Sequence, residues 1–352
     1  MQSFLKEIGR GKRGAQDLRY EEAAQAVEWM VDDRATSAQI GAFFMAARMK
    51  GETVDELRGF VDVLRGASRL LSPNRPVHLE IGGPYDGRDR TFSSTVASAL
   101  VLSAAGFSIA LTGSETLPPK YGVTVLDILK AMGMPVIPLS GVDRQDQAAR
   151  FAERSLDKLG IGYLHLDDLC FPLAGLRPIR LQLGFRTLLC TVEKYLNLSQ
   201  SERLITGIFH GNAMETMGQL VQGLGYPNAL VVQGPEGSGE FDCAHRTRYL
   251  RVTPDALRPE MLDPRELGLM ADEEGTTPVT TPGEQARRTL AVLHGQSGLD
   301  RDRVCLNVAA QLRFLEATPD LESGLELARK LLDSQEALRL WEAWKTQHIA
   351  LL

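Results

Sequence analysis

Two glycine-rich turns with hydroxyl and arginine side chains stand out between residues 80 and 134. The first turn reads Ile81-Gly82-Gly83-Pro84-Tyr85-Asp86-Gly87-Arg88-Asp89-Arg90-Thr91-Phe92, and Ser93-Ser94-Thr95 leads from it into an apolar segment. A short apolar segment then ends at a second turn, Thr112-Gly113-Ser114-Glu115. Glycine lets the backbone come close to a ligand, and the free N–H groups and dipole of a helix start favour an anion. Two such turns, one strand apart, predict a site for phosphate or a phosphosugar.

The candidate binding residues of this site are glycines, hydroxyl side chains, one carboxylate and cations. They are Gly82, Gly83, Asp86, Gly87, Arg88, Arg90, Thr91, Thr95, Thr112, Gly113, Ser114 and Lys120. Arginine can hold a phosphate through two N–H groups at once, and Lys120 lies just past the second turn. The alternative is a pair of ordinary turns, because most glycines in any chain serve only to reverse its direction.

The elements that position these residues follow from hydrophobic spacing. Residues 20–31 have apolar side chains at helical spacing, and Thr36 or Ser37 is a candidate N-cap for a second helix through Met49. Thr53 and Glu56 form a candidate capping box for a third helix. After residue 76, short apolar strands alternate with helical segments; the strands include 77–81, 108–111, 229–232 and 249–252. This alternation predicts a mostly parallel sheet covered by helices.

Helical patterns return at residues 171–198 and in the tail from residue 282 to 352. We therefore expect an α/β protein with a small all-helical domain beside a larger α/β domain, and a cleft between them. The small domain would comprise residues 1–72 and 172–198, and the large domain residues 73–171 and 199–352. Residues 263–282, rich in acidic residues, glycine, threonine and proline, predict an exposed loop.

Composition narrows the class of protein. The chain has 352 residues, of which 43% are hydrophobic and 24% charged, enough for one large or two ordinary domains. A formal charge of −6 argues against bulk attraction to nucleic acid or anionic membrane, but it does not exclude a local basic groove. The four cysteines are far apart and predict reduced, buried thiols. Without a secretory signal or a segment long enough to span a bilayer, we expect a cytoplasmic protein with no membrane partner.

Three further segments carry a family resemblance. They are Ala35-Thr36-Ser37-Ala38-Gln39-Ile40-Gly41-Ala42-Phe43 with Met49-Lys50-Gly51-Glu52-Thr53, Pro178-Ile179-Arg180-Leu181-Gln182-Leu183-Gly184-Phe185-Arg186-Thr187, and Ala229-Leu230-Val231-Val232-Gln233-Gly234-Pro235-Glu236-Gly237. With the first glycine turn, they resemble the anthranilate phosphoribosyltransferase family, the glycosyltransferase family 3 fold. The resemblance covers most of the chain. It implies a helical domain, an α/β domain and a homodimer through the helical domain, which Phe43, Phe44 and Met45 could serve by exposing apolar surface.

The resemblance also implies a reaction. In this family the pyrophosphate of phosphoribosyl pyrophosphate leaves as an amine attacks the anomeric carbon, and magnesium neutralises much of the departing charge. Arg180 and Arg186, in the segment similar to the family's hinge helix, would bind the acceptor; ion pairs are the alternative. His210 follows a predicted strand end and is a further acceptor-site candidate, with a buried or capping histidine as the alternative.

The departures from the family pattern fall on the chemistry. Pro84 and Tyr85 are interposed in the first glycine loop, and Leu111-Thr112-Gly113-Ser114 replaces a Lys-His-Gly-Asn turn. The metal-binding Asp-Glu pair of the family becomes Gly239-Glu240. Glu236 and Glu240 could share a magnesium ion, and solvated loop carboxylates are the alternative. No residue is assigned a catalytic role.

Two hypotheses follow. The first, narrowly preferred, is a diverged phosphoribosyltransferase-like protein that binds a phosphoribosyl donor or another small phosphate-bearing ligand, with an acceptor other than anthranilate. The second is a non-catalytic nucleic-acid-binding protein on the same fold. Tyr85-Asp86-Gly87-Arg88 and Glu7-Ile8-Gly9-Arg10-Gly11-Lys12 resemble a divergent branch associated with nucleic-acid binding. The loop arginines would then contact backbone phosphates, and binding would fall steeply with salt.

Overall fold

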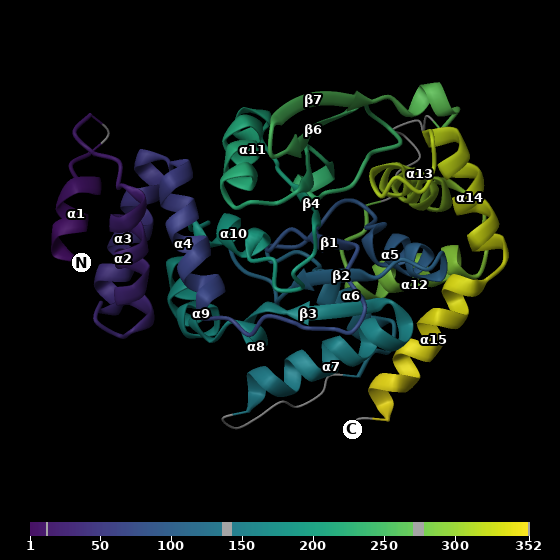
Figure 1. Cartoon of the computed structure of the whole chain (residues 1–352), viewed down its shortest axis with the longest axis horizontal. Helices are drawn as coiled ribbons and strands as arrows, with labels where there is room; N and C mark the ends of the chain where they lie inside the picture. The colour runs from purple at the N-terminus through teal and green to yellow at the C-terminus, as the bar shows by residue number, and fades with distance from the viewer. Residues whose placement is uncertain (12, 136–142, 270–277, 351–352) are drawn as a thin grey trace.

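The computed structural model describes residues 1–11, 13–135, 143–269 and 278–350. A bundle of N-terminal helices lies beside a larger α/β part, at the purple end of the colour scale in Figure 1. The bundle helices are α1 (Gln2–Ile8), α2 (Tyr20–Val31), α3 (Ser37–Lys50) and α4 (Val54–Gly66). Both predicted caps are confirmed: the hydroxyls of Thr36 and Thr53 accept from N–H groups three residues on, and the side chains of Gln39 and Glu56 reciprocate.

The sheet has seven strands in the order β3-β2-β1-β4-β5-β6-β7. Their bounds are β1 (Leu79–Gly82), β2 (Ile109–Gly113), β3 (Ile161–His165), β4 (Arg203–Gly207), β5 (Asn228–Val232), β6 (Thr247–Thr253) and β7 (Ala256–Leu262). Strands β1 to β5 pair in parallel, and β6 and β7 extend one edge antiparallel. The expected mostly parallel sheet beside a helical domain is confirmed.

Helices cover both faces of the sheet. Those after β1 are α5 (Thr95–Ala104), α6 (Val125–Ala131), α7 (Arg144–Leu159), α8 (Leu166–Leu169), α9 (Phe171–Leu183), α10 (Leu189–Val192), α11 (Met214–Gly223), α12 (Pro282–Leu293), α13 (Leu299–Phe314), α14 (Leu321–Asp333) and α15 (Glu336–Ile349). Short 3₁₀ turns are η1 (Glu193–Tyr195), η2 (Gly211–Ala213), η3 (Pro235–Gly237) and η4 (Pro264–Leu267). In Figure 1 the tail helices α12 to α15 lie on the side of the sheet away from the N-terminal bundle.

Alternate strand residues feed two apolar cores, as a period of two requires. Leu230 and Val232 of β5 pack with α5 and the tail helices, whereas Ala229 and Val231 face the opposite core. That second core is continuous from α2–α4 through α10 to β4, β5 and α11. The small and large parts of the molecule therefore share one apolar core. The domain boundaries expected from the sequence stay a prediction.

Two local expectations need correction, and a third is tested only in part. The helix expected over residues 171–198 breaks at Gly184, which has a φ of 67° and ends α9; chain reversal at a left-handed glycine stops a helix. Phe43 and Phe44 are 2% and 0% exposed, so they are core residues, and only Met45 of that trio reaches the surface. Of the expected loop at 263–282, residues 264–267 form a 3₁₀ turn, and residues 270–277 lie outside the described residues.

Within the described ranges, the longest and most apolar helices still fall short of what crossing a membrane requires.

Candidate functional site

The first glycine turn joins β1 to α5 at the carboxyl end of the parallel strands. Gly87 has a φ of 70°, and a Cβ there would lie 2.3 Å from the carbonyl carbon of Gly122. The neighbouring backbone pairs with the segment after the second turn, because the N–H of Arg88 donates to the Val123 carbonyl at 2.9 Å. The glycine is thus required by close packing of two chain segments.

Glu240 fills the amino end of α5. Its carboxylate accepts from the backbone N–H groups of Ser94 and Thr95, both at 3.1 Å, and from the Thr95 hydroxyl at 2.6 Å. The Ser93 hydroxyl donates at 2.9 Å, and Arg88 Nη1 donates at 2.7 Å. Arg88 and Glu240 are both buried. An internal carboxylate therefore occupies the helix terminus at which the sequence predicts a phosphate.

Glu236 fills a second cluster of donors in the same loop. The backbone N–H groups of Asp89, Arg90 and Thr91 donate to its carboxylate at 3.0, 3.1 and 2.9 Å, and the Thr91 hydroxyl donates at 2.8 Å. Lys120 also forms an ion pair with Glu236. Glu236 itself has a left-handed backbone with a φ of 54°. Residues predicted to bind phosphate are thus brought together, and they bind this side chain.

The electrostatics of both carboxylates favour the charged form. Burial works against ionisation of Glu240, but the charge of Arg88 and the donors at Thr95 and Ser94 outweigh it and lower its pKa. Burial likewise opposes ionisation of Glu236. The hydrogen bonds that its carboxylate accepts from Lys120 and from backbone N–H groups outweigh burial and lower its pKa well below the usual range. Each carboxylate is a permanent anion at neutral pH, with its compensating charge already beside it.

This arrangement does not fit a magnesium ion held by Glu236 and Glu240. A carboxylate binds magnesium through the lone pairs of its oxygens. In both side chains these oxygens already accept hydrogen bonds from other residues of the protein. Coordination would leave Arg88 buried without its anion, which is costly. A diphosphate ligand would meet the same obstacle, because the N–H groups that would hold it are already used.

The second turn lines a cleft that is almost closed. Between Gly83, Tyr85, Thr112, Gly113 and Ser114 there is a cavity of about 10 Å³, the space of a single water molecule. Tyr85, one of the two interposed residues, contributes to this closure. The sequence offered no reason to single out Lys194, which also lines this cleft and whose Nζ donates to the Gly207 carbonyl at 2.9 Å.

The predicted acceptor residues are not brought together by contacts. Arg186 lies beside the first glycine turn and donates to Asp86 at 2.8 Å, with 38% of its side chain exposed. Arg180 is buried, where it donates to Glu193 at 2.9 Å. His210 is exposed beyond the end of β4, against the ring of Phe209. Arg186 is therefore the member of this set that borders the predicted phosphate loop.

The nucleic-acid alternative depends on the loop arginines. Arg88 has a side-chain exposure of 2% and pairs with Glu240, so it cannot reach a backbone phosphate in this arrangement. Arg90 is 66% exposed and is free to do so. The alternative stays a prediction, with one loop arginine fewer to support it.

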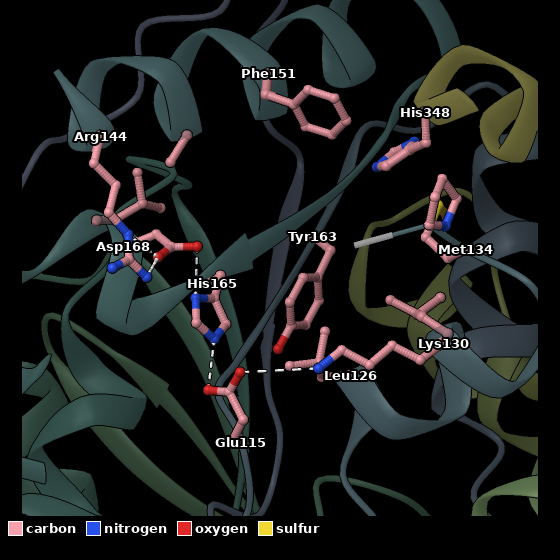
Figure 2. A pocket seen from close by; sticks show the side chains of 14 residues that line it. Glu115, Leu126, Lys130, Met134, Arg144, Phe151, Tyr163, His165, Asp168 and His348 are labelled. Atoms are coloured by element: carbon pink, nitrogen blue, oxygen red, sulfur yellow. Dashed lines mark hydrogen bonds and ion pairs between the residues drawn. The ribbon is translucent and has the colours of Figure 1, made fainter. Parts of the chain in front are cut away.

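A cluster that the sequence reading did not assign lies at the neighbouring edge of the sheet. His165 ends β3, and its Nε2 and Nδ1 lie 2.9 Å from Glu115 and 2.7 Å from Asp168 (Figure 2). Burial opposes charge on the imidazole, but its bonds to Asp168 and Glu115 outweigh burial and raise the pKa of His165 to about 9. The sequence signal is partial: Glu115 comes soon after the predicted strand 108–111, at a position where ligands of α/β proteins bind, whereas none of the predicted strands ends at His165.

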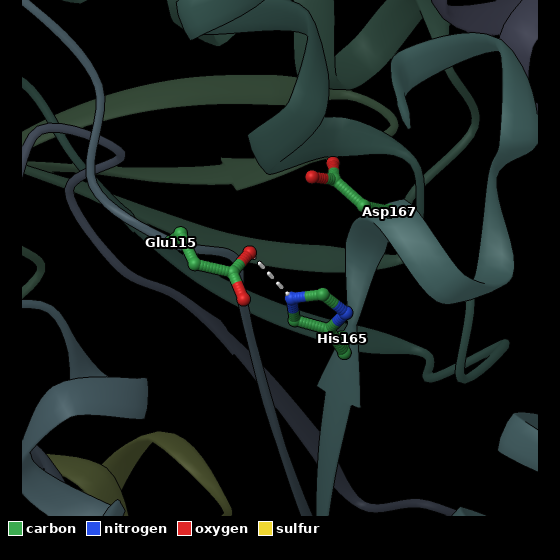
Figure 3. A group of neighbouring side chains, drawn as sticks. All are labelled: Glu115, His165 and Asp167. Atoms are coloured by element: carbon green, nitrogen blue, oxygen red, sulfur yellow. Dashed lines mark hydrogen bonds and ion pairs between the residues drawn. The ribbon is translucent and has the colours of Figure 1, made fainter. Parts of the chain in front are cut away.

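Figure 3 shows Glu115, His165 and Asp167, which lie close enough to suggest a metal site. Asp167, however, forms an ion pair with Arg177 and accepts from the Ser114 hydroxyl at 3.3 Å. A metal would have to displace a guanidinium from Asp167 and an imidazole from Glu115. The cluster is accounted for by its own ion pairs.

Comparisons with known proteins extend over nearly the whole chain. Residues 2–68 match the helical bundle domain of the glycosyl transferase family, and residues 82–338 match its a/b domain. The anthranilate phosphoribosyltransferase of Thermomicrobium roseum is 32% identical over 341 residues, which are 96% of this chain and 94% of that protein. That of Symbiobacterium thermophilum is 29% identical over 342 residues, with coverage of 97% and 96%.

Solved structures agree with this assignment. The crystal structure of anthranilate phosphoribosyltransferase from Thermus thermophilus superimposes with a TM-score of 0.82 at 25% identity, covering 98% of both chains. The enzyme from Saccharomyces cerevisiae, in complex with PRPP and Mg, gives a TM-score of 0.83 at 18% identity, covering 99% of this chain and 98% of that one, and so supports the fold. On the strength of the family match over most of its length, this chain belongs to the glycosyl transferase family that includes the anthranilate phosphoribosyltransferases.

Proposed function

We propose that this chain is a phosphoribosyltransferase-like protein that binds a phosphate-bearing ligand at the rim of the first glycine turn and does not transfer a phosphoribosyl group to anthranilate. One observation carries the proposal: Glu236 and Glu240 occupy both clusters of donors that would otherwise hold a diphosphate. Neutralisation of a departing diphosphate is what such a transfer needs most from the protein.

Two cations remain reachable at the rim of this loop. Arg90 is 66% exposed and only loosely paired, at 3.6 Å from Asp89, and Arg186 is 38% exposed beside Asp86. An exposed guanidinium can donate to a phosphate at little desolvation cost, and Arg186 contacts Asp86 through Nη2, so its Nη1 can meet a phosphate while this pair is kept. These two side chains are therefore the proposed contacts for the ligand's phosphate, and a small phosphorylated molecule is the proposed partner.

The test is a calorimetric titration of the whole protein with phosphoribosyl pyrophosphate and with ribose 5-phosphate, each with and without magnesium. We expect binding that is independent of magnesium and weakened about ten-fold in Arg186→Gln, which corresponds to the loss of one charged hydrogen bond. Arg287→Gln removes an arginine that is 66% exposed on α12 and is the matched control.

A second assay measures the release of pyrophosphate from phosphoribosyl pyrophosphate in the presence of anthranilate and magnesium. We expect no release above the rate without protein. Magnesium-dependent binding together with release would overturn the proposal and establish a working transferase. If neither ligand binds at millimolar concentration, the ligand part of the proposal is wrong, and single-stranded DNA across a salt series tests the nucleic-acid alternative.

A further inference from the structure

A separate cavity of about 310 Å³ lies at the ends of β2 and β3, between α6, α7 and α15. Its size is at the lower end of the range of small-molecule sites. One side is apolar, formed by Leu126, Leu129, Met134, Phe151 and Tyr163. Figure 2 shows the ring of Phe151 and the ring of His348 turned toward this space from α7 and α15. The cavity can therefore bury an apolar body.

The opposite side is a chain of five alternating charges. Arg144 Nε donates to Asp168 at 2.6 Å, and Asp168 and Glu115 contact the two nitrogens of His165. Lys130 Nζ lies 3.9 Å from Glu115 at the far end. Both imidazole nitrogens lie beside carboxylates, and these raise the pKa of His165 to about 9, which favours the positively charged ring at neutral pH. This row of charged side chains therefore begins and ends with a cation.

The charges around the cavity do not balance. Among the described residues that line it, three cations face two carboxylates, and His348 is neutral because burial lowers its pKa to about 4. Two further acids that act on Tyr163 have their own partners: Asp127 accepts from Thr124 at the start of α6, and Asp167 pairs with Arg177. A net positive charge beside an apolar wall favours a ligand that carries one negative charge.

We infer that this cavity binds a hydrophobic monocarboxylate, with its apolar body against Phe151 and Leu126 and its carboxylate toward Lys130. Lys130 is the most loosely paired of the three cations. Its contact with Glu115 is the longest among these five charged side chains, and 35% of its own side chain is exposed. This site is distinct from the glycine turn and does not depend on the function proposed for that turn.

Three probes of one shape test the charge. The whole protein is titrated calorimetrically at low ionic strength and pH 7 with 2-naphthoate, 2-naphthamide and 2-naphthylmethylammonium. We expect naphthoate to bind at least ten-fold more tightly than the neutral amide, and the ammonium to bind more weakly than both. Equal affinity of naphthoate and naphthamide, or no saturable binding of naphthoate at millimolar concentration, would overturn the inference.

Two variants test the place. Lys130→Gln should remove the preference for naphthoate over the amide, whereas Lys158→Gln, at the exposed far end of α7, should retain it. Ala148→Phe adds a ring to the lining and should abolish binding of all three probes, with an unchanged thermal midpoint as evidence of folding. Undiminished naphthoate binding in either Lys130→Gln or Ala148→Phe would show that the ligand sits elsewhere and would overturn the assignment.

Discussion

Two charged clusters lie at the carboxyl edge of the same sheet, and they differ in how far their charges are satisfied. Around the glycine turn, Glu240 and Glu236 each accept from five donors of the chain, and little space is left. Along the cavity, the charge chain from Arg144 to Lys130 ends on a cation at each side of an open space. A loop with the composition of an anion site can have all its donors satisfied by the protein's own carboxylates. A strand end with no such composition can keep an excess of positive charge.

The largest effect that would sharpen this contrast comes from the buried pair. Arg88→Ala leaves Glu240 charged and buried without its cation, and we expect a loss of about 3–5 kcal/mol in the free energy of unfolding. Urea denaturation measures it. Arg90→Ala, an exposed arginine two residues on, should change stability by less than about 0.5 kcal/mol. A loss below about 1 kcal/mol for Arg88→Ala would mean that the first cluster is not closed.

The second effect concerns Glu236. Glu236→Gln removes the charge opposite Lys120 and sets an amide group among N–H donors, so we expect a loss of about 2–3 kcal/mol in unfolding free energy. The same change leaves Lys120 without its anion and the N–H donors with a weaker acceptor, so affinity for inorganic phosphate, measured by calorimetry, should rise. Glu266→Gln is the exposed control. Unchanged stability and unchanged phosphate affinity together would contradict the picture of a filled site.

The third prediction uses pH to probe the open cluster. The pKa of His165 is raised to about 9 in the folded chain, so its contribution is fully present below pH 6.5 and is lost as the pH rises through 9. The stability difference between wild type and His165→Gln should fall from about 2 kcal/mol at pH 6 toward zero at pH 10. Unfolding midpoints at several pH values measure it, with exposed His210→Gln as control. A pH-independent difference would be evidence against the charged imidazole.

The smallest expected effect is that of Lys130→Gln on stability. Its contact with Glu115 is 3.9 Å long and partly exposed, so we expect a change below about 0.5 kcal/mol, although the same variant should alter naphthoate binding. Chemical denaturation detects a larger change. A loss above 1 kcal/mol would place Lys130 among structural residues and make the two clusters alike.

Much of the fold could be predicted from the sequence because local signals agreed with it. The capping residues Thr36 and Thr53 and the apolar spacing of 20–31 are short-range features that each specify a helix. The break at Gly184 was missed because a single glycine inside a helical pattern is compatible with continuing it.

The candidate site was less predictable, because its chemistry depends on pairs far apart in the chain. Glycines, hydroxyls and arginines between residues 82 and 95 indicated an anion, but the anion proved to be carried by Glu240, some 145 residues away from Thr95. No local pattern distinguishes a loop that binds a ligand phosphate from one that binds its own carboxylate. His165 and Glu115 were passed over for the same reason: their meaning depends on the register of β2 and β3.

The apolar core shared by the bundle and the sheet has a mechanical consequence. Phe60 and Leu57 of α4 and Leu220 of α11 belong to one continuous buried cluster, and Arg65 reinforces the seam by donating to the carbonyls of Leu196 and Tyr195. If roughly 400 Å² of apolar surface were exposed by opening this contact, the cost would be on the order of 10 kcal/mol, comparable to the stability of a whole domain. The shared core therefore holds the bundle against the sheet. We expect α4 and α11 to lose amide-exchange protection together, as one cooperative unit.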